Sequence, residues 1–144
     1  MNWKEEAVEK LRKYDAMRQA EQNLPQEITR LEEAAGALRS AGFDASVATS
    51  NRRGQEDALL NNMVQRQELQ LALHQAEQWL AITNRALGAL TPEEKLVLHR
   101  LYIYPERGAV ERLCAELGAE QSTVYRKRDK ALHRFTLALY GTVS

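Results

Sequence analysis

The 144-residue chain contains few of the residues that interrupt helices or cross-link a fold. It has one cysteine, three prolines and seven glycines. A single cysteine, Cys114, excludes an internal disulfide framework and favours a reducing compartment. Leu, Ala, Glu, Gln and Arg dominate the composition, and these residues are strong helix formers. We therefore predict an all-α protein.

Long apolar runs are also missing from the sequence. No stretch approaches the length that a membrane-spanning helix needs. The first residues, MNWKEE, are charged and lack the apolar core that is typical of a secretory signal peptide. We expect a cytoplasmic protein with no membrane partner.

The sequence shows no pattern typical of a catalytic or metal centre. His74, His99 and His133 are far apart and lack the spacing of metal ligands. No P-loop, dinucleotide fingerprint or serine-nucleophile motif occurs. Cys114 falls on the predicted inner face of a helix, where packing explains it better than catalysis. We expect no enzyme activity, no metal and no cofactor.

Charge is balanced over the whole chain but not along it. The formal net charge is zero, which taken alone argues against a nucleic-acid binder. Residues 1–90 hold eleven basic and thirteen acidic side chains, a net −2. Residues 121–136 hold five basic side chains and one acid, Asp129, a net +4. The basic residues of this segment are Arg126, Lys127, Arg128, Lys130 and Arg134. One short segment therefore carries a strong positive charge.

The first forty residues show helical periodicity with one interruption. Apolar residues at spacings of three and four predict a helix over residues 2–23 and a second over 24–40. Pro25 is expected to kink or break the helix between them. Residues 42–55 are small and polar without a helical period, and they predict a flexible loop.

A long helix is predicted over residues 56–89, with a narrow apolar seam. The seam consists of Leu69, Leu73, Ala76, Leu80, Thr83, Leu87 and Leu90. Its spacing of four and three resembles a heptad repeat. Two interpretations remain open at this point. The seam could pack on residues 24–40 in a hairpin within one chain, or it could form a coiled coil with a second chain, and the two arrangements can coexist. The second interpretation predicts a homodimer through the N-terminal helices.

Thr91 begins a new helix with clear local signals. Thr91 is a good N-cap, Pro92 suits the first helical position, and Glu94 completes a capping box. The helix should end near Pro105, because proline restricts the residue before it. We therefore predict two regions, a helical assembly region over 1–90 and a second domain over 91–144.

Residues 109–135 fit the size requirements of a helix-turn-helix. Such a motif joins two helices through a turn of three or four residues. Cys114 supplies a small residue on the first helix, and Gly118 tolerates the positive φ of the turn. Val124, six residues beyond Gly118, is the expected inward anchor of the second helix. Further inward positions are Leu113, Leu117, Ala131, Leu132 and Phe135.

With Val124 inward, the polar residues at the start of the second helix should point outward. The N-terminal residues of a recognition helix are those that reach base edges. Arg pairs well with guanine and Gln with adenine in the major groove, whereas later Lys and Arg residues suit phosphate contacts. The predicted set that contacts double-stranded DNA is Gln121, Ser122, Thr123, Tyr125, Arg126, Lys127, Arg128 and Lys130.

These segments resemble region 4 of sigma factors, which recognises promoter DNA. The resemblance lies in residues 91–98 (TPEEKLVL), 118–126 (GAEQSTVYR) and 130–132 (KAL). The whole chain is similar to small phage and prophage regulators of the ArpU and RinA-like group, closely over 86–141 and loosely over 1–85. The resemblance implies transcriptional control of late phage genes and a possible contact with RNA polymerase.

A small terminase subunit is the alternative function. Such a protein also joins a helix-turn-helix to oligomerising helices, but it forms a ring that marks viral DNA for packaging. A third interpretation is an adaptor that binds RNA polymerase without reading DNA. The first two differ in oligomer size and in the DNA site bound.

Overall fold

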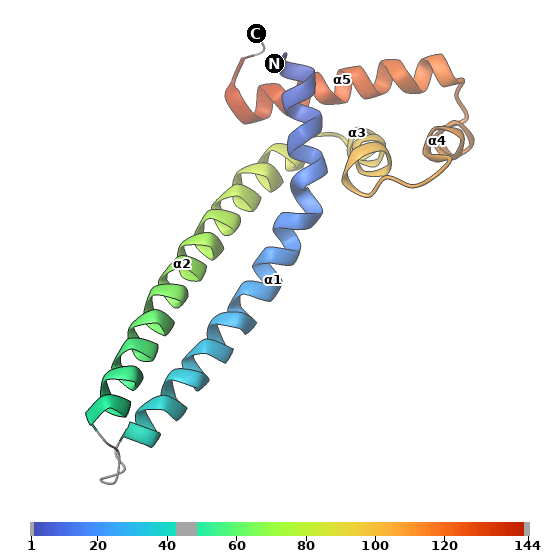
Figure 1. The fold of residues 1–144 in the computed structure, drawn as a ribbon. Coiled ribbons are helices and arrows are strands. Elements are labelled where there is room, and N and C mark those ends of the chain that lie inside the picture. The colour runs from blue at the N-terminus through green and yellow to red at the C-terminus, as the bar shows by residue number, and fades with distance from the viewer. Residues whose placement is uncertain (1, 43–48, 143–144) are drawn as a thin grey trace. The chain divides into compact units, whose positions relative to one another are not determined.

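The computed structural model describes residues 2–42 and 49–142, and its elements in that part of the chain are helical (Figure 1). Helix α1 spans Trp3–Gly42 and helix α2 spans Thr49–Gly88. Helix α3 (Pro92–Leu98) continues as a π-helical turn, η1 (His99–Ile103). Helices α4 (Ala109–Leu117) and α5 (Gln121–Tyr140) complete the described chain. The predicted all-α class is confirmed for these residues. No helix among them is both long and apolar enough to cross a membrane.

The chain divides into two compact units, which we describe separately. Unit 1 comprises residues 1–18 and 78–144, and unit 2 comprises residues 19–77. The predicted division at residue 90 therefore differs from the observed one. The reason is that both ends of the predicted N-terminal region bury apolar side chains against the C-terminal helices. One core cluster of unit 1 contains Ala7, Leu11, Ala86, Leu90, Leu98, Ile103, Ala131, Leu132 and Phe135.

Helix α1 passes through Pro25 without ending, so the predicted break at this residue is wrong. The helix starts where the Asn2 side-chain oxygen accepts a hydrogen bond from the Glu5 N–H at 2.9 Å. Pro25 removes one backbone hydrogen bond, a loss of about 3 kcal/mol in a helix interior. Both Pro25 and Glu21 are exposed, so water can reach the carbonyl of Glu21 that loses its donor. Burial of Ile28 and Leu31 holds the helix together beyond this point.

Part of the loop predicted over 42–55 is helical instead. Residues 43–48 lie outside the described part of the chain, but residues 49–55 form the first turns of α2. Extending an existing helix by a residue costs far less than nucleating one, so the strong helix over 56–88 propagates backward. Arg52, Arg53 and Gln55 favour this extension. Gly54 opposes it by about 1 kcal/mol, and residues 49–51 (Thr-Ser-Asn) oppose it more weakly.

Four of the seven residues of the predicted seam are buried within the chain, and Leu69, Leu73 and Leu87 are half-buried. Ala76, Leu80, Thr83 and Leu90 are each at most 5% exposed. In unit 2, the Asn62 amide donates a hydrogen bond to the Leu31 carbonyl at 2.8 Å, which joins α2 to α1. Asn62 is itself 7% exposed. Within unit 2 the observed arrangement is the hairpin within one chain. The coiled coil between chains stays a prediction.

A second core cluster in unit 1 positions the C-terminal helices. Val97, Leu113 and Val124 are all fully buried in it, and they come from α3, α4 and α5. The predicted inward position of Val124 is confirmed. The capping box is confirmed as well, because Thr91 accepts from the Glu94 N–H at 3.2 Å and Glu94 accepts from the Thr91 N–H at 3.0 Å.

The π-helical turn η1 ends the third helical segment. The Tyr104 N–H donates to the His99 carbonyl five residues earlier, at 2.9 Å. This wider turn lets Leu98 and Ile103, five residues apart, enter the same core cluster. Pro105 stops the segment, because the residue before a proline avoids helical geometry. Tyr104 accordingly has φ −127° and ψ 71°.

Val124 should be essential for the stability of unit 1. We expect Val124→Ala to lower the free energy of unfolding by about 2–3 kcal/mol, because it leaves a cavity between three helices. Val64→Ala is the matched control, since Val64 is 43% exposed, and it should change stability by less than ~0.5 kcal/mol. Urea unfolding followed by circular dichroism measures both. Equal losses in the two variants would contradict the assignment of Val124 to the core.

Candidate nucleic-acid interface

A short turn sets the direction in which α5 leaves α4. Residues 118–120 connect the two helices. Gly118 adopts φ 60° and ψ 39°, a left-handed conformation that favours glycine. The Ala119 N–H then donates to the Cys114 carbonyl at 3.1 Å, which satisfies one carbonyl at the end of α4. The predicted role of Gly118 in the turn is confirmed.

The start of α5 has no side-chain cap. Glu120 occupies the N-cap position with extended backbone, and its side chain makes no capping hydrogen bond. The Val124 N–H donates to the Glu120 carbonyl at 3.0 Å and begins the helical ladder. The first N–H groups of α5 are therefore not bonded by this side chain, and the positive end of the helix dipole lies there. The Glu120 carboxylate places one negative charge at the same end.

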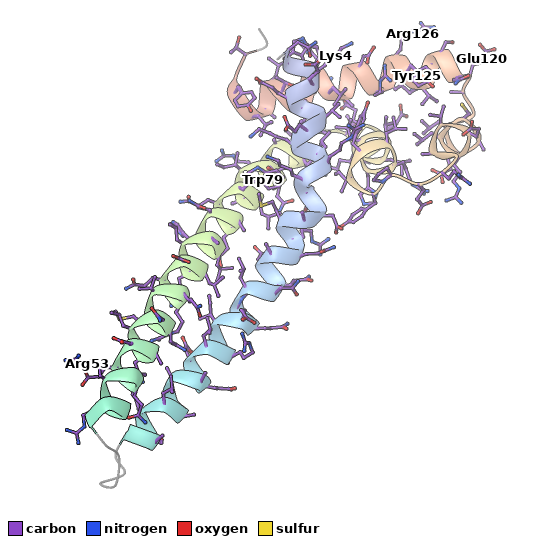
Figure 2. All side chains as sticks on the ribbon, in the orientation of Figure 1. Lys4, Arg53, Trp79, Glu120, Tyr125 and Arg126 are labelled. Atoms are coloured by element: carbon purple, nitrogen blue, oxygen red, sulfur yellow. The ribbon has the colours of Figure 1, made fainter. Side chains whose placement is uncertain are left out.

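The first residues of α5 differ in exposure according to their position around the helix. Gln121, Ser122 and Arg126 are exposed, as predicted from the inward position of Val124. Figure 2 shows Arg126 on the side of α5 away from α3 and α4. Tyr125, which was also predicted to point outward, is half-buried, and so is Thr123. The residues best placed to reach another molecule are thus the three exposed ones.

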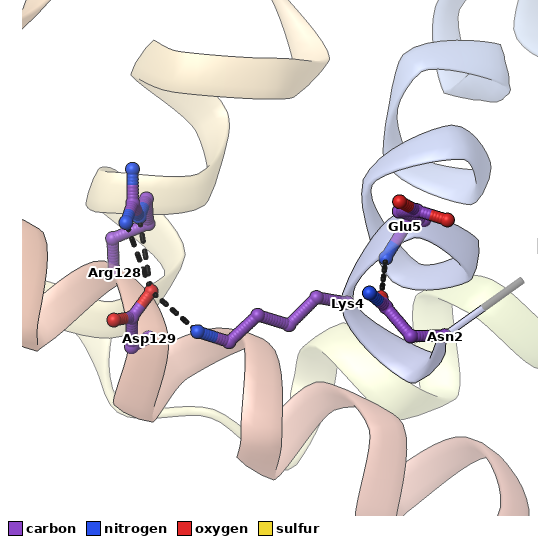
Figure 3. Close-up of polar contacts among 5 residues, drawn as sticks. All are labelled: Asn2, Lys4, Glu5, Arg128 and Asp129. Atoms are coloured by element: carbon purple, nitrogen blue, oxygen red, sulfur yellow. Dashed lines mark hydrogen bonds and ion pairs between the residues drawn. The ribbon is translucent and has the colours of Figure 1, made fainter.

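Tyr125 and Arg128, which both lie on α5, belong to a network of polar contacts along this helix. The Gln121 amide donates to the Tyr125 hydroxyl at 3.1 Å. The Arg128 guanidinium lies 4.8 Å from the centre of the Tyr125 ring. Arg128 also pairs with Asp129, with Nη2 3.0 Å from Oδ1, and Lys4 Nζ of α1 lies 3.5 Å from the same oxygen (Figure 3). Arg128 is therefore already engaged within the protein.

Two further cations of α5 pair with the capping region of α3. Lys127 forms an ion pair with Glu93. Arg134 Nε lies 3.4 Å from Oε2 of Glu94, whose side chain is only 10% exposed. Among residues 2–42 and 49–142, Arg126 and Lys130 form no ion pair. Residues 121–136 carry a net charge of +4, and adding the two acids Glu93 and Glu94 lowers this to +2. The positive charge that a ligand meets at α5 is therefore smaller than the net charge of residues 121–136.

The two compact units carry opposite charge. Unit 1 contains fifteen basic and eleven acidic residues, a net +4. Unit 2 contains five basic and nine acidic residues, a net −4. The zero net charge of the chain is the sum of these two terms. An anionic partner is attracted to unit 1 and repelled by unit 2.

The sequence did not reveal that the start of α1 packs on α5. The Trp3 ring meets the His133 ring edge-on, with ring centres 5.6 Å apart. Lys4 reaches Asp129, as described above. The apolar spacing of residues 2–23 predicts a helix with one apolar stripe, which begins at Trp3. Nothing in the sequence indicates which other helix covers this stripe.

A groove beside α5 is lined by α1, η1 and α5 side chains, with Val8, Tyr102 and Leu132 as its apolar part. Burial raises the pKa of the Tyr102 hydroxyl above its ordinary value, and nearby Arg128 opposes this shift. Tyr102 therefore stays neutral at physiological pH. In the described part of the chain no three His, Cys, Asp or Glu side chains gather as metal ligands would.

These contacts give unit 1 an exposed helix start on a fixed core and two unpaired cations on one helix. No protein-family model matches the chain, and comparison with curated proteins and with solved structures finds no significant match.

Proposed function

We propose that this chain is a sequence-specific DNA-binding regulator of transcription and not an enzyme. In this proposal α4 and α5 act as a helix-turn-helix, and α5 enters the major groove as the recognition helix. Unit 1 is the DNA-binding part, and it includes the start of α1 as a structural support. The following observations support the proposal.

One observation carries most of the argument. The helix that follows a tight, glycine-containing turn is held by a fully buried anchor, Val124, and presents exposed Gln121, Ser122 and Arg126 at its start. These side-chain types read base edges in the major groove, since Arg pairs with guanine O6 and N7 and Gln with adenine N6 and N7. Because Arg126 has no ion pair among the described residues, binding DNA does not require breaking one.

Charge supports a polyanionic partner. Unit 1 has a net charge of +4, and Lys130 lies one turn beyond Arg126 on α5, where it suits a phosphate. The uncapped N–H groups at the start of α5 can also face a phosphate, as helix N-termini often do. An adaptor that binds only protein would not need this accumulation of positive charge around one helix.

The resemblance to sigma-factor region 4 and to phage regulators directs the proposal to promoter DNA. We expect the bound promoters to control late phage or prophage genes, with RNA polymerase as a second contact of the same unit. The small terminase subunit remains the alternative, and the DNA site distinguishes it. No feature of unit 1 favours a packaging site over a promoter.

Mapping of the bound sites across the source genome tests the proposal directly. We expect enrichment at one or a few promoters upstream of virion or lysis genes. Enrichment at a packaging site would instead support the terminase alternative. The absence of any enriched site, in cells where the protein is abundant, would contradict sequence-specific binding altogether.

Arg126 should contribute to affinity and to base preference. We expect Arg126→Ala to weaken binding to the selected site by about 1–3 kcal/mol and to relax the base preference at one position. Arg85→Ala is the charge-matched control, because Arg85 is an exposed arginine at the end of α2 and not on α5. Titration of labelled DNA, with circular dichroism to check folding, measures the effect. An equal loss in both variants would mean that Arg126 contributes only charge.

The salt dependence of DNA binding should report the ion pairs within unit 1. If Arg126 and Lys130 alone neutralise phosphates, the slope of log affinity against log salt is about −2, whereas four free cations would give about −3.6. Asp129→Asn removes the shared partner of Arg128 and Lys4, and it should raise affinity and steepen the slope by about 1–2. Titrations at several salt concentrations measure this. A wild-type slope near zero would contradict phosphate contact, and an unchanged slope in the variant would contradict the role given to Asp129.

A further inference from the structure

Helix α2 carries a second apolar stripe in unit 2, separate from the buried seam. The outer stripe consists of Leu60, Met63, Val64 and Leu71, which are 54%, 42%, 43% and 58% exposed. At about 100° per residue these four side chains lie within an arc of roughly 100°. Asn62, which bonds to α1, lies about 200° from Leu60 around the helix. The outer stripe therefore faces away from the hairpin contact.

Four large apolar side chains exposed together on one helix face indicate a binding surface rather than chance exposure. We propose that the outer stripe binds the same stripe of a second copy of this chain, with the two α2 helices antiparallel. Most of the seam is already buried within the chain, whereas the four side chains of the outer stripe are exposed. The proposal does not depend on DNA binding.

The charges along the stripe are complementary in an antiparallel register. Arg52 and Glu77 lie on the same flank of the stripe, about 20° apart around the helix. When Leu60 lies beside Leu71 of the other copy, Arg52 lies within two residues of Glu77 of that copy. The same register places Glu56 opposite His74. Each of these contacts occurs twice, because the arrangement has two-fold symmetry.

A parallel arrangement is less favourable for two reasons. Gln67 and His74 lie in the same arc of α2 as the outer stripe. A parallel arrangement would place each of them against its own counterpart, so that polar groups would face each other in the contact. Antiparallel helix dipoles also attract each other weakly, whereas parallel dipoles repel.

The contact should be weak in free solution. The segment from Arg52 to Glu77 is roughly 39 Å long, so a helix about 10 Å wide buries about 800 Å² in total. Stable dimers usually bury 1,200–2,000 Å². We therefore expect a dissociation constant on the order of tens of micromolar. Two copies held on neighbouring DNA sites would associate more strongly through their effective concentration.

Sedimentation equilibrium of the full chain without DNA tests the proposal. We expect a reversible monomer–dimer equilibrium at concentrations up to about 0.5 mM, in line with weak interfaces of this size. Leu60→Lys with Leu71→Lys should raise the dissociation constant at least tenfold, with an unchanged circular dichroism spectrum. Leu137→Lys is the matched control, because Leu137 is 39% exposed on α5, and it should leave the equilibrium unchanged.

Charge reversal tests the orientation. Arg52→Glu and Glu77→Arg should each weaken the dimer, and the double variant should restore it, because the two residues meet across the antiparallel contact. A chain that stays monomeric up to about 0.5 mM, or a dimer that ignores the two leucine substitutions, would overturn the proposed surface. A double charge reversal that fails to restore the dimer would overturn the antiparallel register. Since no DNA is present, these results are independent of the proposed function.

Discussion

The inner face of α5 is the surface on which the helices of unit 1 are assembled. Near its start, Val124 packs with Val97 of α3 and Leu113 of α4. Further along, Ala131, Leu132 and Phe135 pack with α1, with the end of α2 and with η1. Because a helix repeats every 3.6 residues, fixing this inner face also fixes which residues face outward. The exposure of Ser122 and Arg126 is a geometric consequence of the burial of Val124. The candidate interface is therefore positioned by the same side chains that stabilise the unit.

The same geometry divides the cations of α5 into two groups. Side chains on the flanks of the helix come close to acids, so that Lys127 meets Glu93 and Arg134 meets Glu94. Arg128 is held between Tyr125 and Asp129. Arg126 and Lys130 form no ion pair among the described residues, although Lys130 lines the same pocket as Glu93 and Glu94. A count of charges along the sequence treats all of them as equal, whereas their availability to a ligand depends on where α3 lies. Exposed ion pairs of this kind are weak, so a phosphate can compete for these cations at moderate cost.

Local signals in the sequence were the most informative ones. The capping box of Thr91 and Glu94, the turn at Gly118 and the anchor Val124 could all be predicted, because each depends on residues within one or two turns. The errors concern how segments meet or how far they extend. The break predicted at Pro25 does not occur. Apolar side chains of α1 are buried on both sides of Pro25, and local helix propensity does not include this burial. Composition predicts a loop over residues 49–55, but helix α2 extends into them. The partner of the Trp3 stripe and the contact of Asn62 with Leu31 are non-local, and no periodicity indicates them.

The hairpin of unit 2 has a thin core, and this has a consequence for the order in which the chain opens. Among the described side chains of residues 19–77, the buried ones are Ile28, Leu31, Ala35, Asn62 and Ala76. Unit 1 buries larger groups, including Phe135, Leu11, Leu98 and Leu113. Segments with few buried apolar contacts open locally at a lower free energy than the rest of a protein. Backbone amides in the unit 2 parts of α1 and α2 should therefore exchange with solvent deuterium earlier than those of α5. Each long helix thus joins a less stable segment in unit 2 to a more stable segment in unit 1 through one continuous ladder of hydrogen bonds.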